Sequence, residues 1–278
     1  MSPPLLVVDG DSFAHRAFHA LPRSIRRADG RPGNLLTGFT NMLLRLWEAE
    51  RPRGIVVGWD TLFVPTYRHE LLPGYQAGRE FDPELLEQLD VAPGLLEAAG
   101  IVCGKAPGFE ADDFLGAAVA AERARGGAAL VATSDRDAFQ LAADDVTILQ
   151  PVRGVSEIAR IGPAEVRERY GVEPAQVPDF IALRGDPSDK IPGARGVGAK
   201  TAASLLAQYG SLEAMLDAGR FAAEADALRM YRHVATFDAE APLPPLPEHG
   251  PDWAAGAEAA DALGLARVAG RLREVASS

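Results

Sequence analysis

The sequence predicts an α/β fold, with a mostly parallel open sheet flanked by helices. Three short apolar segments that end in aspartate have the length and composition of buried parallel strands. They are Leu5–Asp9, Gly54–Asp60 and Ala128–Asp135. Helical patterns occupy Leu35–Glu50, Pro83–Ala99 and Ala111–Arg125. Strands that alternate with helices form βαβ units, so we expect helices on both faces of the sheet. Ligands of such sheets bind beyond the carboxyl ends of the strands, where Asp9, Asp60 and Asp135 would meet.

The chain changes character in its second half. From Pro163 onward the pattern is helical, with short loops rich in glycine and proline. The five prolines of Ala241–Pro251 predict extended chain. Asp252–Val275 is a helical pattern rich in alanine, arginine and leucine.

The composition is that of an ordinary globular protein of 278 residues, 47% of them hydrophobic and 24% charged. No apolar run is long enough to cross a bilayer and no basic segment precedes the first one, so we expect no membrane and a cytoplasmic protein. The single cysteine, Cys103, excludes an internal disulfide and a zinc cluster, and we expect it to be a small buried side chain. A net charge of −11 argues against a nucleic-acid ligand if only the total is considered, but the positions of the acids matter more.

Acidic residues are concentrated in three further places. Glu110, Asp112 and Asp113 open a helix, Asp135 and Asp137 follow the third strand, and Asp186 and Asp189 lie in the helical half. The helix dipole alone favours one or two acids in a first turn, but carboxylates packed this densely repel one another. Mg²⁺ or Mn²⁺ would remove that repulsion, since both prefer carboxylate and water oxygens. Two such ions support in-line cleavage of a phosphodiester, which is the reaction we infer.

Two other segments are consistent with a nucleic-acid ligand. Thr66 to Phe81 mixes aromatic and basic residues, as expected of either a surface loop or a nucleic-acid contact. Ile191–Ala202 is rich in glycine, but Ala199 stands where a P-loop requires glycine before Lys200 and Thr201. A helix–hairpin–helix element, whose backbone amides bind phosphate without reading sequence, fits this segment better.

Taken together, these motifs resemble the 5′-nuclease domain of bacterial DNA polymerase I and the wider flap endonuclease family, in its free-standing form. The resemblance covers roughly residues 4 to 250. The motifs that carry it, in chain order, are Val8-Asp9-Gly10, Arg16-Ala17-Phe18-His19-Ala20, Arg68-His69-Glu70, Glu110-Ala111-Asp112-Asp113, Asp135-Arg136-Asp137, Gly185-Asp186-Pro187-Ser188-Asp189 and Gly196-Val197-Gly198-Ala199-Lys200-Thr201.

The resemblance implies a role for each motif residue. Asp9, Asp60, Glu110 and Asp112 would serve a first divalent ion, Asp112 lying close to both ions. Asp113, Asp135, Asp137, Asp186 and Asp189 would serve a second ion, with some ligands acting through water. Tyr75 would meet a base beside the cut, and Arg79 would help an arch to clamp the 5′ strand. DNA contacts would come from Arg16, Arg195, Gly196, Gly198, Lys200 and Thr201.

The same resemblance divides the chain and names its partners. It implies a nuclease core over residues 1–175 with an arch at about 66–82, and a helix–hairpin–helix module over 176–236 that often holds K⁺. Residues 237–278 would be a proline-rich segment and a C-terminal helix that pack back on the body. The expected partner is DNA, as 5′ flaps, overhangs, nicked or gapped duplexes, or RNA/DNA hybrids, bound by a monomer in replication and repair.

One departure and three rival interpretations remain at this stage. Gln76 stands where the family commonly has lysine, so either Arg79 or Arg68 covers the missing charge or the chemical step is slower; His15 also replaces a usual tyrosine. Val8–Ser12 mimics the nucleophile motif of haloacid dehalogenase phosphatases, with Asp9 as the nucleophile. The other rivals are a non-catalytic DNA-binding relative and an RNA-cutting nuclease on a similar sheet.

Overall fold

The computed structural model describes residues 3–153 and 157–277, and the expected α/β class is confirmed. Its described strands form one sheet of order β3-β2-β1-β4-β5-β6, in which β6 alone is antiparallel. The strands are β1 Leu5–Asp9, β2 Gly54–Gly58, β3 Val102–Gly104, β4 Ala129–Ala132, β5 Val146–Arg153 and β6 Glu157–Ile161. The second and third predicted strands are therefore shorter than expected, and Asp60 and Asp135 lie in the loops that follow them.

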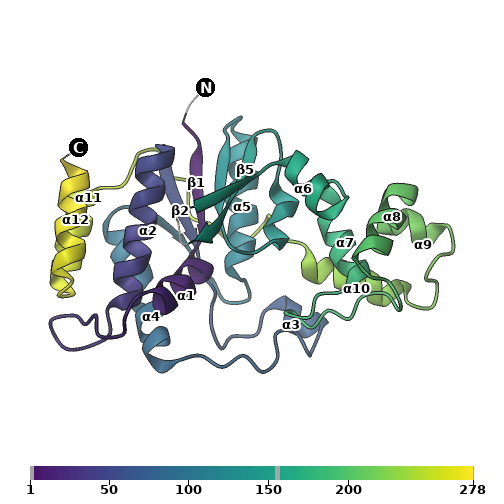
Figure 1. Cartoon of the computed structure of the whole chain (residues 1–278), viewed down its shortest axis with the longest axis horizontal. Coiled ribbons are helices and arrows are strands. Elements are labelled where there is room, and N and C mark those ends of the chain that lie inside the picture. Colours follow the sequence, from purple (N-terminus) through teal and green to yellow (C-terminus); the bar gives the residue numbers. More distant parts are fainter. Residues whose placement is uncertain (1–2, 154–156, 278) are drawn as a thin grey trace.

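Helices cover both faces of the sheet (Figure 1). They are α1 Gly10–Ala20, α2 Asn34–Glu50, α3 Tyr67–Leu71, α4 Pro83–Ala98, α5 Ala111–Ala124, α6 Pro163–Tyr170, α7 Val177–Arg184, α8 Ala199–Tyr209, α9 Leu212–Asp217, α10 Ala225–Ala235, α11 Trp253–Ala262 and α12 Ala266–Ala276, with 3₁₀ turns η1 Asp137–Leu141 and η2 Pro174–Gln176. Side chains alternate across β1: Leu6 and Val8 face the core shared with α1, α2, α4, α11 and α12, whereas Leu5 and Val7 face α5 and the helical module.

Two glycines allow helices to begin directly against the strand ends. A Cβ on Gly10 would lie 2.6 Å from the carbonyl oxygen of Gly58, and a Cβ on Gly58 would lie 2.5 Å from the carbonyl oxygen of Ala111. Both distances are shorter than non-bonded contacts allow, so only glycine fits at these positions. The close approach brings the first turns of α1 and α5 to the carboxyl edge of the sheet, together with the acids they carry.

The C-terminal region forms two helices where the sequence suggested one helical pattern. Gly264, with φ of +71°, ends α11 and separates it from α12. Trp253 of α11 packs against Trp47 of α2 with ring centroids 5.5 Å apart, and Figure 1 shows α11 and α12 at the end of the molecule opposite α8 and α9. Across the described ranges, no helix combines the length and apolarity that a bilayer crossing requires.

Candidate metal centre and nucleic-acid interface

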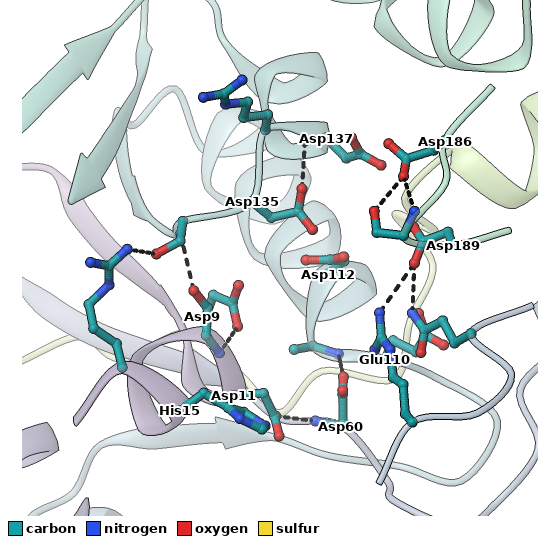
Figure 2. A pocket seen from close by; sticks show the side chains of 18 of the residues that line it. Asp9, Asp11, His15, Asp60, Glu110, Asp112, Asp135, Asp137, Asp186 and Asp189 are labelled. Carbon is teal, nitrogen blue, oxygen red and sulfur yellow. Dashed lines mark hydrogen bonds and ion pairs between the residues drawn. The ribbon is translucent and has the colours of Figure 1, made fainter. Parts of the chain in front are cut away.

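A cavity of about 1000 Å³ lies beyond the carboxyl ends of the central strands, and its walls are acidic (Figure 2). Eight of the nine predicted metal ligands line it, together with one further aspartate. The lining acids are Asp9, Asp11, Asp60, Glu110, Asp112, Asp135, Asp137, Asp186 and Asp189. They come from the end of β1, from α1, from the loops after β2 and β4, from the start of α5, from η1 and from the loop after α7. The fold therefore brings together acids separated by up to 180 residues of sequence.

Hydrogen bonds fix several of these carboxylates in place. Asp9 caps α1 by accepting the amide of Ser12 at 2.9 Å, and its other oxygen accepts the Thr133 hydroxyl at 2.6 Å. Asp60 accepts the amide of Ala111 at 2.7 Å. The amide of Asp137 donates to the Asp135 carboxylate at 2.8 Å. The acids are held by the loops themselves, so the cavity is largely formed without a ligand.

Burial makes these carboxyls costly to ionise. The pKa of Asp9 is raised to about 7, chiefly by desolvation and with a smaller contribution from the nearby charges of Asp60 and Asp135. Glu110 is raised to a pKa of about 7, again chiefly by burial. The pKa of Asp112 lies well above its ordinary value because of burial first and then the charges of Asp135 and Asp9. A bound cation would relieve this repulsion, which is the electrostatic condition expected of a metal centre.

The donor set fits hard divalent cations, but the cavity is not a closed cage. Every lining acid offers carboxylate oxygens, the ligands that Mg²⁺ and Mn²⁺ prefer. Among residues 3–153 and 157–277, however, no three acidic, histidine or cysteine side chains lie close enough to hold one ion directly. Coordination would therefore use water between ion and carboxylate, or small side-chain rotations, and Mg²⁺ usually keeps several waters when bound.

Asp113 is the one predicted ligand that the structure places elsewhere. Its carboxylate is fully buried and accepts hydrogen bonds from both terminal guanidinium nitrogens of Arg68 at 2.7 Å. It also accepts the backbone amides of Glu110 at 3.0 Å and Asp238 at 2.9 Å. Arg68 is 2% exposed, so in this structure its charge lies inside the protein and not at the cavity wall. The buried ion pair favours a structural role for both residues over the metal-binding role predicted for Asp113 and the catalytic role predicted for Arg68.

The segment predicted to form an arch holds one short helix, α3, and joins the cavity through its second half. The Tyr75 hydroxyl donates to Glu110 at 2.9 Å and the ring is 5% exposed, so in this conformation it does not meet a base as predicted. Gln76 donates to the Tyr75 hydroxyl at 2.9 Å and to Asp189 at 3.2 Å. Arg79 lines the cavity and pairs with Asp189 at 3.3 Å. Gln76 and Arg79 therefore both contact Asp189 at the cavity wall.

The predicted DNA contacts divide into two places. Arg16 lines the acidic cavity and donates to the Ser134 hydroxyl at 2.8 Å. The others lie outside it, on the turn from α7 to α8 and the first turn of α8, and all are exposed: Arg195, Gly196, Gly198, Lys200 and Thr201. A Cβ at Gly196 or Gly198 would meet no atom within 4 Å, so the backbone that precedes α8 is open to solvent. An open glycine turn before a helix N-terminus suits contact with phosphate.

Several site residues were missed by the sequence reasoning. Asp11 accepts the amide of Asp60 at 2.7 Å and so joins the loop after β2 to α1. The sequence could have indicated this role, because Asp11 follows Asp9 by two residues at the start of a helix. Thr133 donates to Asp9, and Ser134 accepts from Arg16. Nothing in the sequence marked these two residues except their position after a predicted strand. Arg184 also lines the cavity, stacked 5.2 Å from the Phe180 ring centroid.

Comparison with known families matches nearly the whole chain. Residues 4–171 match the 5′-3′ exonuclease N-terminal resolvase-like domain, and residues 172–250 match the 5′-3′ exonuclease C-terminal SAM fold. The chain belongs to the 5′-3′ exonuclease family. A 5′-3′ exonuclease of Mycobacterium tuberculosis is 41% identical over 238 residues, covering 78% of this chain and 74% of that protein. DNA polymerase I of Mycobacterium bovis is 46% identical over 217 residues, covering 77% of this chain but only 24% of the polymerase.

Solved structures share the fold at lower identity. The T5 D15 protein co-crystallised with metal ions superposes with a TM-score of 0.70 at 18% identity, over 98% of this chain and 99% of that one. The catalytic core of Rad2 in complex with DNA substrate superposes with a TM-score of 0.59 at 14% identity, over 99% of this chain and 91% of that one. These matches show the common architecture of the sheet and the helical module.

Proposed function

We propose that this member of the family is a structure-specific 5′-nuclease, an exonuclease and flap endonuclease that hydrolyses DNA phosphodiesters near single-strand/duplex junctions with two divalent ions. The observation that carries the proposal is the gathering of eight motif acids in one cavity, beside an arch segment and a hairpin turn. A single buried carboxylate has many structural explanations. Eight around one open cavity are unfavourable without bound cations, so the arrangement supports metal-dependent chemistry.

The ions, Mg²⁺ or Mn²⁺, would activate the attacking water and neutralise charge on the entering and leaving oxygens. Asp9, Asp60, Glu110 and Asp112 would hold the first ion. Asp135, Asp137, Asp186 and Asp189 would hold the second, without Asp113. Figure 2 shows Asp112 between the two groups, and the charges of Asp135, Asp9 and Asp60 all act on its pKa. Asp112 is therefore the residue best placed to serve both ions.

The groups that would position DNA lie on two sides of the acids. Arg79 and Arg16 bring positive charge to the cavity wall, where they would hold the phosphates that flank the cut. The open turn before α8 would hold duplex backbone without reading sequence, and a K⁺ ion could bridge its carbonyl oxygens to phosphate. We propose that a monomer in the cytoplasm acts on 5′ flaps, overhangs and nicked or gapped duplexes. RNA/DNA hybrids fit the same backbone contacts.

The geometry disfavours a phosphatase that uses Asp9 as a covalent nucleophile. Such an enzyme would leave Glu110 and Asp189 on the cavity wall, and the open glycine turn before α8, without roles. A non-catalytic relative is disfavoured because eight acids still line the cavity.

The proposal is tested by offering the native protein two substrates with Mg²⁺ or Mn²⁺: a 5′-labelled flap duplex and p-nitrophenyl phosphate. We expect metal-dependent cutting within a few nucleotides of the junction, no cutting in EDTA and little ester turnover. Rapid ester turnover without flap cleavage would assign the cavity to a phosphatase. Tight flap binding without cleavage, by folded protein with either metal, would assign it to a DNA-binding relative. Cleavage of the DNA flap is also compared with cleavage of an all-RNA flap. Faster cleavage of the RNA flap would favour the RNA-cutting alternative.

A further inference from the structure

An exposed phenylalanine and a partly buried one form an aromatic surface beside the acidic cavity. Phe63, in the loop between β2 and α3, is 78% exposed. Its ring lies edge-on to Phe81, with centroids 6.1 Å apart. Phe81 in turn lies 5.9 Å from the ring of His15, which lines the acidic cavity. We call Phe63 and Phe81 the aromatic edge. It continues from the cavity wall into solvent.

The loop holds Phe63 in place. Its φ of +63° is in the left-handed region, which a bulky side chain rarely adopts. The chain that leads into the turn is anchored by two hydrogen bonds. The Asp60 amide donates to Asp11 at 2.7 Å, and the Thr61 hydroxyl donates to the Ala106 carbonyl at 2.9 Å. A large apolar ring presented to water by an anchored turn is a feature of binding surfaces.

The aromatic edge is continuous with the proposed catalytic site. A second, smaller cavity of about 270 Å³ lies under the loop, lined by Phe63 and Phe81. It shares Asp60, Glu110 and Arg79 with the acidic cavity. A strand whose phosphate is held at the acids would pass Arg79 and then the two rings. Figure 1 shows the chain between α3 and α4 running along the lower edge of the molecule, below the sheet.

We propose that the aromatic edge stacks unpaired nucleobases of the displaced 5′ strand, an inference that rests on the proposed function. Every base offers a flat π-face, so stacking on phenylalanine binds single strands without reading their sequence. The nearby Arg79 would hold the phosphate between stacked bases. Tyr75, the aromatic that the sequence suggested for a base contact, is buried against Glu110, whereas Phe63 is exposed and Phe81 is partly exposed. The aromatic edge would therefore favour substrates with an unpaired 5′ segment over a simple nick.

The test is equilibrium binding in EDTA, where no cutting is needed, to three labelled duplexes. One carries a 5′ flap, one carries the same flap with abasic sites at its first unpaired positions, and one is nicked without a flap. The variants are Phe63→Ser, Phe63→Tyr and the control Val152→Ser. Val152 is an apolar residue of β5, 55% exposed, that does not line either cavity. Phe63 is largely in solvent, so its replacement should leave the fold intact, and thermal melts check this.

We expect Phe63→Ser to weaken flap binding about fivefold or more, the loss of one stacked base. It should change binding of the nicked and abasic duplexes less than twofold. Phe63→Tyr should bind as the native protein does, and Val152→Ser should be unchanged on all three. Equal losses on the normal and abasic flaps, or no loss on either, would overturn base stacking. A native mass that doubles with concentration and reverts in Phe63→Ser, with flap binding unchanged, would assign the surface to self-association instead. If the native protein neither binds nor cuts flaps, the proposed function itself fails.

Discussion

Asp112 and Asp113 are adjacent on the first turn of α5, yet the structure predicts opposite effects when each is changed to asparagine. Asp113→Asn removes the negative charge from a fully buried pair with Arg68, which is itself 2% exposed. The amide keeps only one oxygen for the donors of Arg68, Glu110 and Asp238. Breaking a buried ion pair from one side costs about 3–5 kcal/mol, because an uncompensated charge stays behind.

Asp112→Asn should act in the other direction when no metal is present. The Asp112 carboxyl is buried next to Asp135 and Asp9, and no Arg or Lys forms an ion pair with it among those described. Removing its charge relieves repulsion, so we expect the metal-free protein to gain about 0.5–2 kcal/mol, as happens when strained functional sites are neutralised. The gain should shrink or reverse with Mn²⁺, since ion binding stabilises the native protein more than the variant.

Urea denaturation followed by circular dichroism, in EDTA and in Mn²⁺, measures both effects. Asp90→Asn is the control, because Asp90 is exposed on α4 and does not line the acidic cavity. We expect the order of stability in EDTA to be Asp112→Asn above native and control, with Asp113→Asn lowest. An Asp113→Asn variant as stable as native would refute the structural role of that residue. A strongly destabilised Asp112→Asn in EDTA would refute the idea that repulsion among the cavity acids lowers the stability of the metal-free protein.

Three further predictions concern the cavity and the hairpin. Gly58→Ala places a Cβ 2.5 Å from the Ala111 carbonyl and should lower stability by about 1–3 kcal/mol, seen in urea melts, and should slow single-turnover cleavage by displacing α5. Gln76→Lys adds a cation beside Asp189 and should raise the single-turnover cleavage rate on the order of tenfold; an unchanged rate would mean that Arg79 already supplies the missing charge. Lys200→Ala should weaken duplex binding for every sequence tested and reduce the slope of log Kd against log salt by about 1, measured by anisotropy; an unchanged slope would place Lys200 away from phosphate.

The fold class and most of the cavity could be predicted because both depend on local patterns. Short apolar runs ending in aspartate mark parallel strands, and parallel strands share one carboxyl edge, so Asp9, Asp60 and Asp135 were expected together. The predicted helices Leu35–Glu50 and Pro83–Ala99 match α2 and α4 within one residue at each end. The strands β3, β5 and β6 were missed. The edge strand β3 has only three residues, and the other edge strand, β6, is half-exposed. The apolar run of β5 is interrupted by Pro151, where its pairing with β6 becomes irregular.

What the sequence could not distinguish is which way a side chain points. Asp112 and Asp113 differ by one position, about 100° around the helix, so one faces the cavity and the other faces the interior. The partner of Asp113 is Arg68, which precedes it by 45 residues and belongs to an arch motif that suggested catalysis. The inward direction of Tyr75, whose hydroxyl donates to Glu110, could not be predicted for the same reason. Such pairings depend on tertiary packing.

The most direct test of the two-metal site is single-turnover cleavage of a 5′-labelled flap duplex across a Mn²⁺ titration, with native protein, Asp112→Asn and the control Asp90→Asn. Native protein and control should cut near the junction, and their rates should rise with Mn²⁺ more steeply than a single binding site allows. Asp112→Asn should remain folded and bind the flap, but lose at least about a hundredfold in rate at every Mn²⁺ concentration. Cleavage by Asp112→Asn at the native rate would contradict the account, because the residue placed between both ions would then not be needed.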